Sequence, residues 1–168
     1  MTMEKEKDHT QEQHAAFMKI AIDASEENVI SGKGTPFGAA IVKEGQLIAK
    51  SANKVTADND PTAHAEVAAI RIACQELNTY DLTGCVIYTS CEPCPMCLAA
   101  IYWSKISVVY YGNTRSDAAQ AGFDDDFIYQ EIDKPMQERQ LLTIPLSREE
   151  AQIAFTLWDQ SPLKRKQS

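Results

Sequence analysis

The sequence has no long apolar run and no excess of basic residues. None of its apolar stretches approaches the roughly 18–20 residues that a membrane-spanning helix needs. Asp and Glu number 24 against 16 Lys and Arg, which gives a formal net charge of −8. A protein that grips a nucleic-acid backbone normally presents a basic stripe, and the one basic cluster here is 164–166. We therefore expect no membrane anchor and no nucleic-acid partner.

The first nine residues lack the apolar core of a secretory signal. We expect residues 1–9 to be disordered or frayed, residues 10–168 to form a single domain, and the protein to be cytoplasmic. Three of the five cysteines fall within seven residues. Without a signal peptide, such a cluster indicates metal binding or catalysis before it indicates disulfides.

The pattern of apolar residues predicts an α/β fold. Helices are expected at 11–29, 62–77 (with Thr62 as a possible cap), 95–103 and 148–158, with a weaker pattern at 123–132. Strands are expected at 37–42, 47–52, 85–90 and 106–111, with a weaker pattern at 141–144. The alternation of strand and helix predicts right-handed crossovers and parallel pairing in part of the sheet.

Two motifs thirty residues apart carry the chemistry. The first is His64-Ala65-Glu66 and the second is Pro93-Cys94-Pro95-Met96-Cys97. Zinc prefers imidazole nitrogen and thiolate sulfur, and a catalytic zinc keeps three protein ligands and one open position. Cys94 and Cys97 stand three residues apart at the expected start of a helix, where partial positive charge favours thiolates. We therefore predict one zinc ion per chain, held by His64, Cys94 and Cys97.

Glu66 is the predicted catalytic residue. Two thiolates already balance the charge of the ion, so a carboxylate ligand would weaken its Lewis acidity. A carboxylate just outside the ligand set can instead accept a proton from water and hand it to a ring nitrogen and a leaving amine. Residues i and i+2 of an ideal helix, here His64 and Glu66, lie nearly opposite each other. His64 must therefore stand at the irregular start of its helix, which the preceding residues 60–62 permit.

Either motif alone would fit several kinds of site. A single histidine is more often a surface or core residue, and C-x-x-C alone also suits a structural zinc or a redox site. With Cys91 the second motif reads C-x-x-C-x-x-C, but a ferredoxin-type cluster would need a cysteine where Ile101 stands. A closed Cys3His site that includes Cys91 stays open, and otherwise Cys91, Cys74 and Cys85 are expected in the core. H-x-E together with P-C-x-x-C is the signature of zinc nucleobase deaminases.

On these residues the chain resembles the cytidine-deaminase superfamily and, within it, the bacterial guanine deaminases. The resemblance runs from about Phe17 to Asp133. It is carried by the segments 34–39, 59–66, 88–97 and 121–129. The first three are shared broadly among related deaminases, and the last is the more discriminating.

The resemblance implies a three-layer α/β/α fold with a five-stranded mixed sheet and zinc between the N-termini of the two motif helices. It implies hydrolytic deamination of a free purine base, guanine plus water to xanthine plus ammonia. It also implies a homodimer in which about residues 134–168 are exchanged with, or cover, the partner subunit.

The same resemblance assigns the substrate contacts. Asn53 and the backbone amide of Ala65 would contact the purine, and Phe37 and Trp103 would form the walls of the pocket. Asp125 would accept hydrogen bonds from the 2-amino group and the ring N–H of guanine. A carboxylate accepts such an adjacent pair of donors well, and purines without them would be rejected. Without the resemblance, 124–126 also fits a solvated acidic surface, Asn53 a turn residue, and Phe37 and Trp103 core positions.

Three alternative functions remain. A tRNA adenosine deaminase shares the zinc motif but would need basic and aromatic surface to bind a splayed RNA loop. Guanosine or an amino-triazine such as ammeline shares the edge that Asp125 would read. A non-catalytic protein stabilised by a structural zinc would have no use for Glu66.

Overall fold

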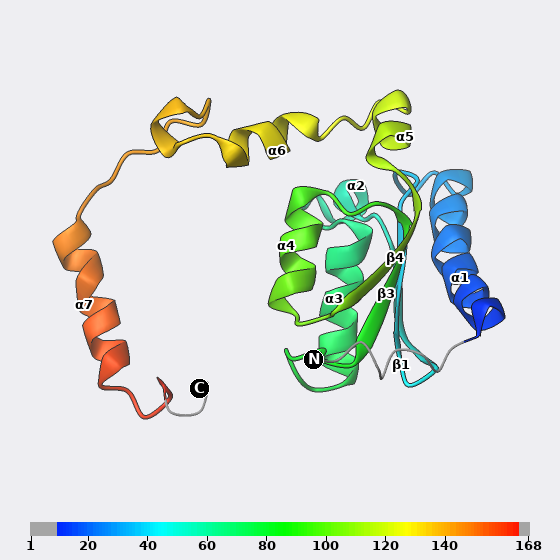
Figure 1. Cartoon of the computed structure of the whole chain (residues 1–168), viewed down its shortest axis with the longest axis horizontal. Coiled ribbons are helices and arrows are strands. Elements are labelled where there is room, and N and C mark those ends of the chain that lie inside the picture. Colours follow the sequence, from blue (N-terminus) through cyan, green and yellow to red (C-terminus); the bar gives the residue numbers. More distant parts are fainter. Residues whose placement is uncertain (1–9, 165–168) are drawn as a thin grey trace. The chain divides into compact units, whose positions relative to one another are not determined.

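A computed structural model describes residues 10–164, which fall into two compact units divided between Tyr129 and Gln130 (Figure 1). The expected frayed segment 1–9 lies outside the described residues. In the part of the chain that the structure describes, no helix has the length and apolarity needed to cross a membrane.

A four-stranded mixed sheet forms the centre of the first unit. Its order is β2-β1-β3-β4, with bounds β1 Gly38–Lys43, β2 Gln46–Ala52, β3 Cys85–Cys91 and β4 Val108–Asn113. β1 pairs antiparallel with β2 and β3, and β3 pairs parallel with β4. Glu44 and Gly45 both have positive φ, which suits the tight turn between β1 and β2. The parallel pair confirms the crossover expected around the helix at 95–103.

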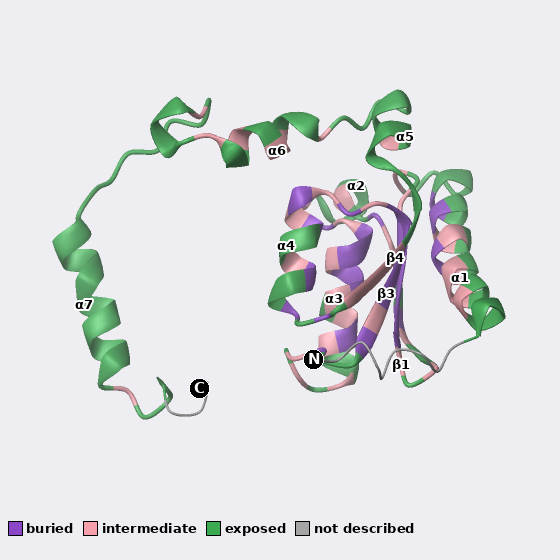
Figure 2. Ribbon diagram, in the orientation of Figure 1, coloured by how far each residue is buried: buried purple, intermediate pink, exposed green. Residues whose placement is uncertain are grey.

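Helices cover both faces of this sheet. α1 (Gln11–Ile30) lies on one face, and α3 (Ala65–Glu76) and α4 (Pro95–Trp103) lie on the other (Figure 1). Strand β1 is buried on both sides, so its successive residues point into opposite layers. Ile41 packs in the cluster with α3 and α4, whereas Val42 packs in the cluster with α1. Figure 2 shows this burial along the sheet and the inner sides of the helices.

Shorter helices complete the described chain. α2 (Val55–Asp58) precedes α3, and α5 (Arg115–Gln120) follows β4. α6 (Asp126–Asp133) contains the division between the units. The second unit has a 3-10 turn at Met136–Glu138 and α7 (Arg148–Asp159), and no residue in its described part, 130–164, is buried.

Three expectations need correction. The sheet has four strands among the described residues, not five, because 141–144 forms no ladder; Pro145, which follows, has no N–H to donate to one. The helix expected from Thr62 begins at Ala65, because His64 has an extended backbone and is the N-cap residue. The helix expected from 123 begins at Asp126. The single-domain interpretation and the exchange of 134–168 stay predictions.

Candidate metal centre and substrate pocket

Two metal-ligand candidates occupy the N-cap positions of two helices. His64 precedes α3 with φ −63° and ψ 157°, and Cys94 precedes α4 with φ −65° and ψ 168°. Neither side chain caps its own helix, so both remain available to a metal. On an ideal helix His64 and Glu66 would point in nearly opposite directions, but the extended backbone at His64 removes this conflict. It confirms that His64 stands at the irregular start of the helix, as expected.

The three predicted ligands come together with the spacing of a tetrahedral zinc site. Nδ1 of His64 lies 3.6 Å from Sγ of Cys94 and 3.6 Å from Sγ of Cys97, and the three ligand atoms lie within 4.8 Å of one another. With Zn–N of about 2.1 Å and Zn–S of about 2.3 Å, tetrahedral geometry separates nitrogen from sulfur by about 3.6 Å. The residues therefore fit a zinc ion.

Cys91 does not join this cluster. Its thiol donates to the Thr114 carbonyl at 3.7 Å, and burial raises its pKa to about 11. Among the described residues, the cluster thus has three protein ligands and not the four of a closed Cys3His site.

Two adjacent sulfurs make this a soft, anionic donor set. The hydrogen bond from Cys97, with help from His64, lowers the pKa of Cys94 to about 4, and the neighbouring sulfur raises the pKa of Cys97. Two thiolates this close repel each other, so a cation between them favours the ionised form of both. Thiolate and imidazole ligands select zinc among the common divalent ions.

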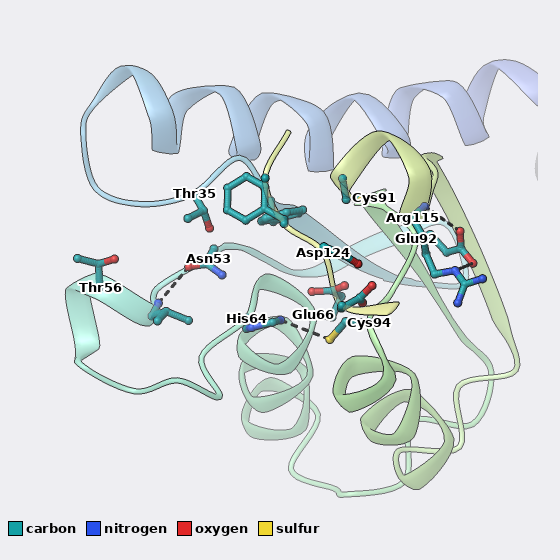
Figure 3. Close-up of a pocket in the computed structure, with 16 residues that line it drawn as sticks. Thr35, Asn53, Thr56, His64, Glu66, Cys91, Glu92, Cys94, Arg115 and Asp124 are labelled. Carbon is teal, nitrogen blue, oxygen red and sulfur yellow. Dashed lines mark hydrogen bonds and ion pairs between the residues drawn. The ribbon is translucent and has the colours of Figure 1, made fainter. Parts of the chain in front are cut away.

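A cavity of about 370 Å³ opens over the cluster. That volume lies at the small end of ligand pockets and suits one ring system. Glu66 lines it, is only 7% exposed, and has a pKa raised by burial. In Figure 3 Glu66 lies beside His64 and Cys94, within the space that the other labelled side chains surround.

The amide of Asn53 has a defined orientation. Its Oδ1 accepts the N–H of Val55 at 3.1 Å, so Nδ2 is left as a donor for the pocket that Asn53 lines. Asn28, buried on α1, donates to the carbonyl oxygens of Asn53 and Thr35, both at 2.9 Å, and so holds these two pocket segments together. Sequence reasoning missed Asn28; the only signal was an asparagine within the amphipathic helix.

Asp125 lines the same cavity, as predicted for a substrate contact. Burial raises its pKa, the Cys94 sulfur raises it further, and the Arg115 cation opposes both. Arg115 also lines the pocket and was not singled out from the sequence. Phe37 lines the pocket too and packs edge-to-face on Phe123 at 5.0 Å between ring centroids.

The other two predicted contacts lie differently. Ala65 is the buried first residue of α3, next to His64, where backbone N–H groups have no partner within the helix. Trp103 ends α4, is 85% exposed and is not among the residues that line the cavity. Its part in a pocket wall stays a prediction.

Comparison with known proteins places this site in a family. Residues 11–113 match the family described as the cytidine and deoxycytidylate deaminase zinc-binding region. The chain belongs to this family. The match includes all three ligand candidates and Glu66, so the deaminase fold and the zinc cofactor that the sequence indicated are confirmed.

Individual members of the deaminase family are similar over different lengths. The guanine deaminase of Bacillus subtilis (strain 168) is 53% identical over 145 residues, 86% of this chain and 93% of that protein. An X-ray structure of guanine deaminase from Bacillus subtilis is 52% identical with a TM-score of 0.86, and the match covers 88% of this chain and 94% of that one. A tRNA-specific adenosine deaminase of Aquifex aeolicus (strain VF5) is 45% identical over 95 residues, 56% of this chain and 62% of that protein.

Proposed function

We propose that this deaminase converts free guanine and water to xanthine and ammonia. The observation that carries the proposal is one small cavity lined by two of the three candidate zinc ligands, a buried carboxylate, an amide donor and an acidic side chain. The similarity to guanine deaminase over most of both chains supports the same substrate.

Glu66 is the proton carrier in this proposal. Zinc held by His64, Cys94 and Cys97 would supply Lewis acidity that makes water a nucleophile near neutral pH. The Glu66 carboxylate accepts the proton that water loses as its oxygen bonds to C2 of guanine, and passes that proton to the ring nitrogen beside C2. The second water proton leaves with the 2-amino group as the C2–N bond breaks, which gives xanthine and ammonia.

The polar groups of the cavity complement both the hydrogen-bond donors and the hydrogen-bond acceptors of guanine. Asp125 accepts from the 2-amino group and ring N–H, whereas Asn53 Nδ2 donates to a ring acceptor. The carboxylates of Glu92, Asp124 and Asp125 all line the cavity, which is unfavourable for the phosphates of a tRNA.

A substrate panel tests the proposal. Ammonia release is measured with zinc-loaded protein on guanine, guanosine, adenine, cytosine, cytidine and ammeline, and inosine formation is measured on a tRNA anticodon stem. We expect turnover of guanine to xanthine above all others. Activity on guanosine, ammeline or tRNA without activity on guanine would refute the assigned substrate, and inactivity on every member would refute the enzyme.

Replacement of Glu66 tests the mechanism. Glu66→Gln keeps the shape of the side chain but cannot accept the proton, so we expect kcat to fall by about 10³-fold, within the range of positioned acid–base groups. Zinc content, measured by atomic emission, and the circular dichroism spectrum should stay as in the parent chain. Full turnover by Glu66→Gln would contradict the proposed role.

We infer further that the deaminase is a cytoplasmic homodimer. The described part of the second unit buries no residue, and α4 exposes Leu98, Tyr102 and Trp103 on one side. Large exposed apolar surfaces usually mark contacts with another chain. A second copy that receives about residues 134–168 would cover such surfaces. All five cysteines are free thiols, which fits a reducing compartment.

A further inference from the structure

The segment that carries Asp125 is attached at both ends. On one side Phe123 packs edge-to-face on Phe37, across the pocket wall. On the other side the Tyr129 hydroxyl donates to the Pro93 carbonyl at 3.2 Å. Between them Asp124 Oδ1 accepts the N–H of Asp126, the first residue of α6, at 3.0 Å. Asp125 therefore projects from a short stretch whose path is fixed before and after it.

Arg115 supports the contact between Tyr129 and Pro93. Its guanidinium lies 4.3 Å above the centre of the Tyr129 ring. Its backbone N–H donates to Glu92 Oε2 at 3.1 Å, and its Nε lies 3.7 Å from Glu92 Oε1. Figure 3 shows Arg115 and Glu92 side by side at the cavity. The Tyr129 ring is thus held by a residue that is itself fixed to Glu92.

Both contacts end on the stretch that delivers a metal ligand. Glu92 and Pro93 directly precede Cys94, the N-cap of α4. The Arg115–Glu92 ion pair is partly solvated, with side chains 42% and 33% exposed, so it is worth little by itself. The hydrogen bond from Tyr129 to Pro93 is the direct link between the Asp125 segment and this stretch.

We propose that Tyr129 is a positioning residue that sets the distance between Asp125 and the metal centre. Tyr129 touches neither substrate nor metal in this proposal, which rests on guanine deamination as the reaction. Loss of its hydroxyl would loosen the carboxylate that binds the base while leaving the ligands and Glu66 in place. Substrate binding should weaken and the chemical step should not.

Tyr129→Phe is the direct test, because it removes the hydroxyl and keeps the ring under Arg115. We expect KM for guanine to rise about tenfold, the equivalent of one hydrogen bond of about 1.4 kcal/mol. We expect kcat to change by less than about twofold and the zinc content to stay constant. Tyr80→Phe is the matched control, since Tyr80 is 71% exposed in the loop between α3 and β3, and its KM should equal that of the parent chain.

A double-mutant cycle with Asp125→Asn separates positioning from general support of the fold. If Tyr129 acts through Asp125, Tyr129→Phe changes kcat/KM little in the Asp125→Asn background. Equal losses of kcat/KM in both backgrounds, an unchanged KM, or a fall in kcat with loss of zinc would each overturn the proposal. Guanine turnover by the parent chain is measured before any variant is compared. If the parent chain does not turn over guanine, the proposed function is refuted and not the role of Tyr129.

Discussion

Among single residues, Thr35 is unusual because its hydroxyl oxygen is buried and has no hydrogen-bond partner among the described residues. Thr89 offers the opposite case, since its buried hydroxyl donates to the Cys91 carbonyl at 2.6 Å. An unpaired buried hydroxyl costs free energy that a methyl group of the same shape does not. The two threonines should therefore respond differently to the same substitution.

We expect Thr35→Val to leave the free energy of unfolding unchanged or to raise it by up to about 1 kcal/mol. Thr89→Val should lower it by about 1–2 kcal/mol, because it leaves a buried carbonyl without its donor. Urea unfolding of the zinc-loaded proteins measures both. A loss in Thr35→Val as large as that in Thr89→Val would show that the Thr35 hydroxyl has a partner after all.

The ligand set was predictable from the sequence and the residues around it were not. His64, Cys94 and Cys97 stand in motifs whose residue types and spacing allow few chemistries other than zinc binding. Asn28 and Tyr129 act through contacts with carbonyl oxygens 25 and 36 residues away in the sequence. Any backbone carbonyl can accept such a bond, so no residue pattern marks which one does.

At the level of helices and strands, the local sequence pattern predicted which elements form better than it predicted their first and last residues. Pro95 at the first helical position predicted a boundary that the structure confirms. The hairpin around Gly45 is also confirmed, although each strand extends one residue further toward the turn than expected. α3 begins three residues later than expected, because His64 has the extended conformation of an N-cap residue, and from this position its side chain joins the ligand cluster. The start of α3 thus coincides with a contact between distant parts of the chain, which local pattern does not reveal.

The contact between α1 and β1 depends on a glycine. A Cβ on Gly38 would lie 2.1 Å from the Ala21 carbonyl oxygen and 2.8 Å from the Ser25 nitrogen, both backbone atoms of α1. The helix therefore packs directly on the strand backbone, and no side-chain movement can make room.

Gly38→Ala should accordingly lower the free energy of unfolding by about 2–4 kcal/mol, as expected for overpacking against backbone. Gly32→Ala is the control: Gly32 has a φ of +67° but open space around it, so the cost should stay near 1 kcal/mol of backbone strain. Thermal and urea unfolding compare the two. Equal effects would mean that α1 shifts away from β1 without penalty.

For the whole chain, the sequence indicated the deaminase family but not how many strands it pairs or what covers its last 35 residues. The apolar residues at 141–144 satisfy a strand pattern, yet strand pairing needs a neighbouring edge that a sequence does not specify. The exposed side chains of α7 include Ile153 and Leu157, which are four residues apart on one face of the helix and which the described part of their unit, 130–164, does not bury. The proposed dimer would cover such a surface.

Light scattering after size-exclusion chromatography tests the proposed dimer. We expect a mass of about 37 kDa, twice the 18.7 kDa of one chain. A charge at Trp103 (Trp103→Glu) should shift the protein toward the monomer, because it would bury an unpaired carboxylate at the contact. Tyr80→Glu, at a similarly exposed position, should leave the mass unchanged. A monomeric parent chain would refute the dimer.

The two N-cap ligands also make the ion a cross-link. His64 and Cys94 lie 30 residues apart in the sequence, and the loop that they close contains all of α3 and β3. An ion bound to both therefore restricts the unfolded chain, much as a disulfide would, and part of its binding free energy becomes folding free energy. Chelation would thus abolish turnover and also make this central helix and strand easier to unfold, so zinc supply would govern the lifetime of the protein as well as its activity.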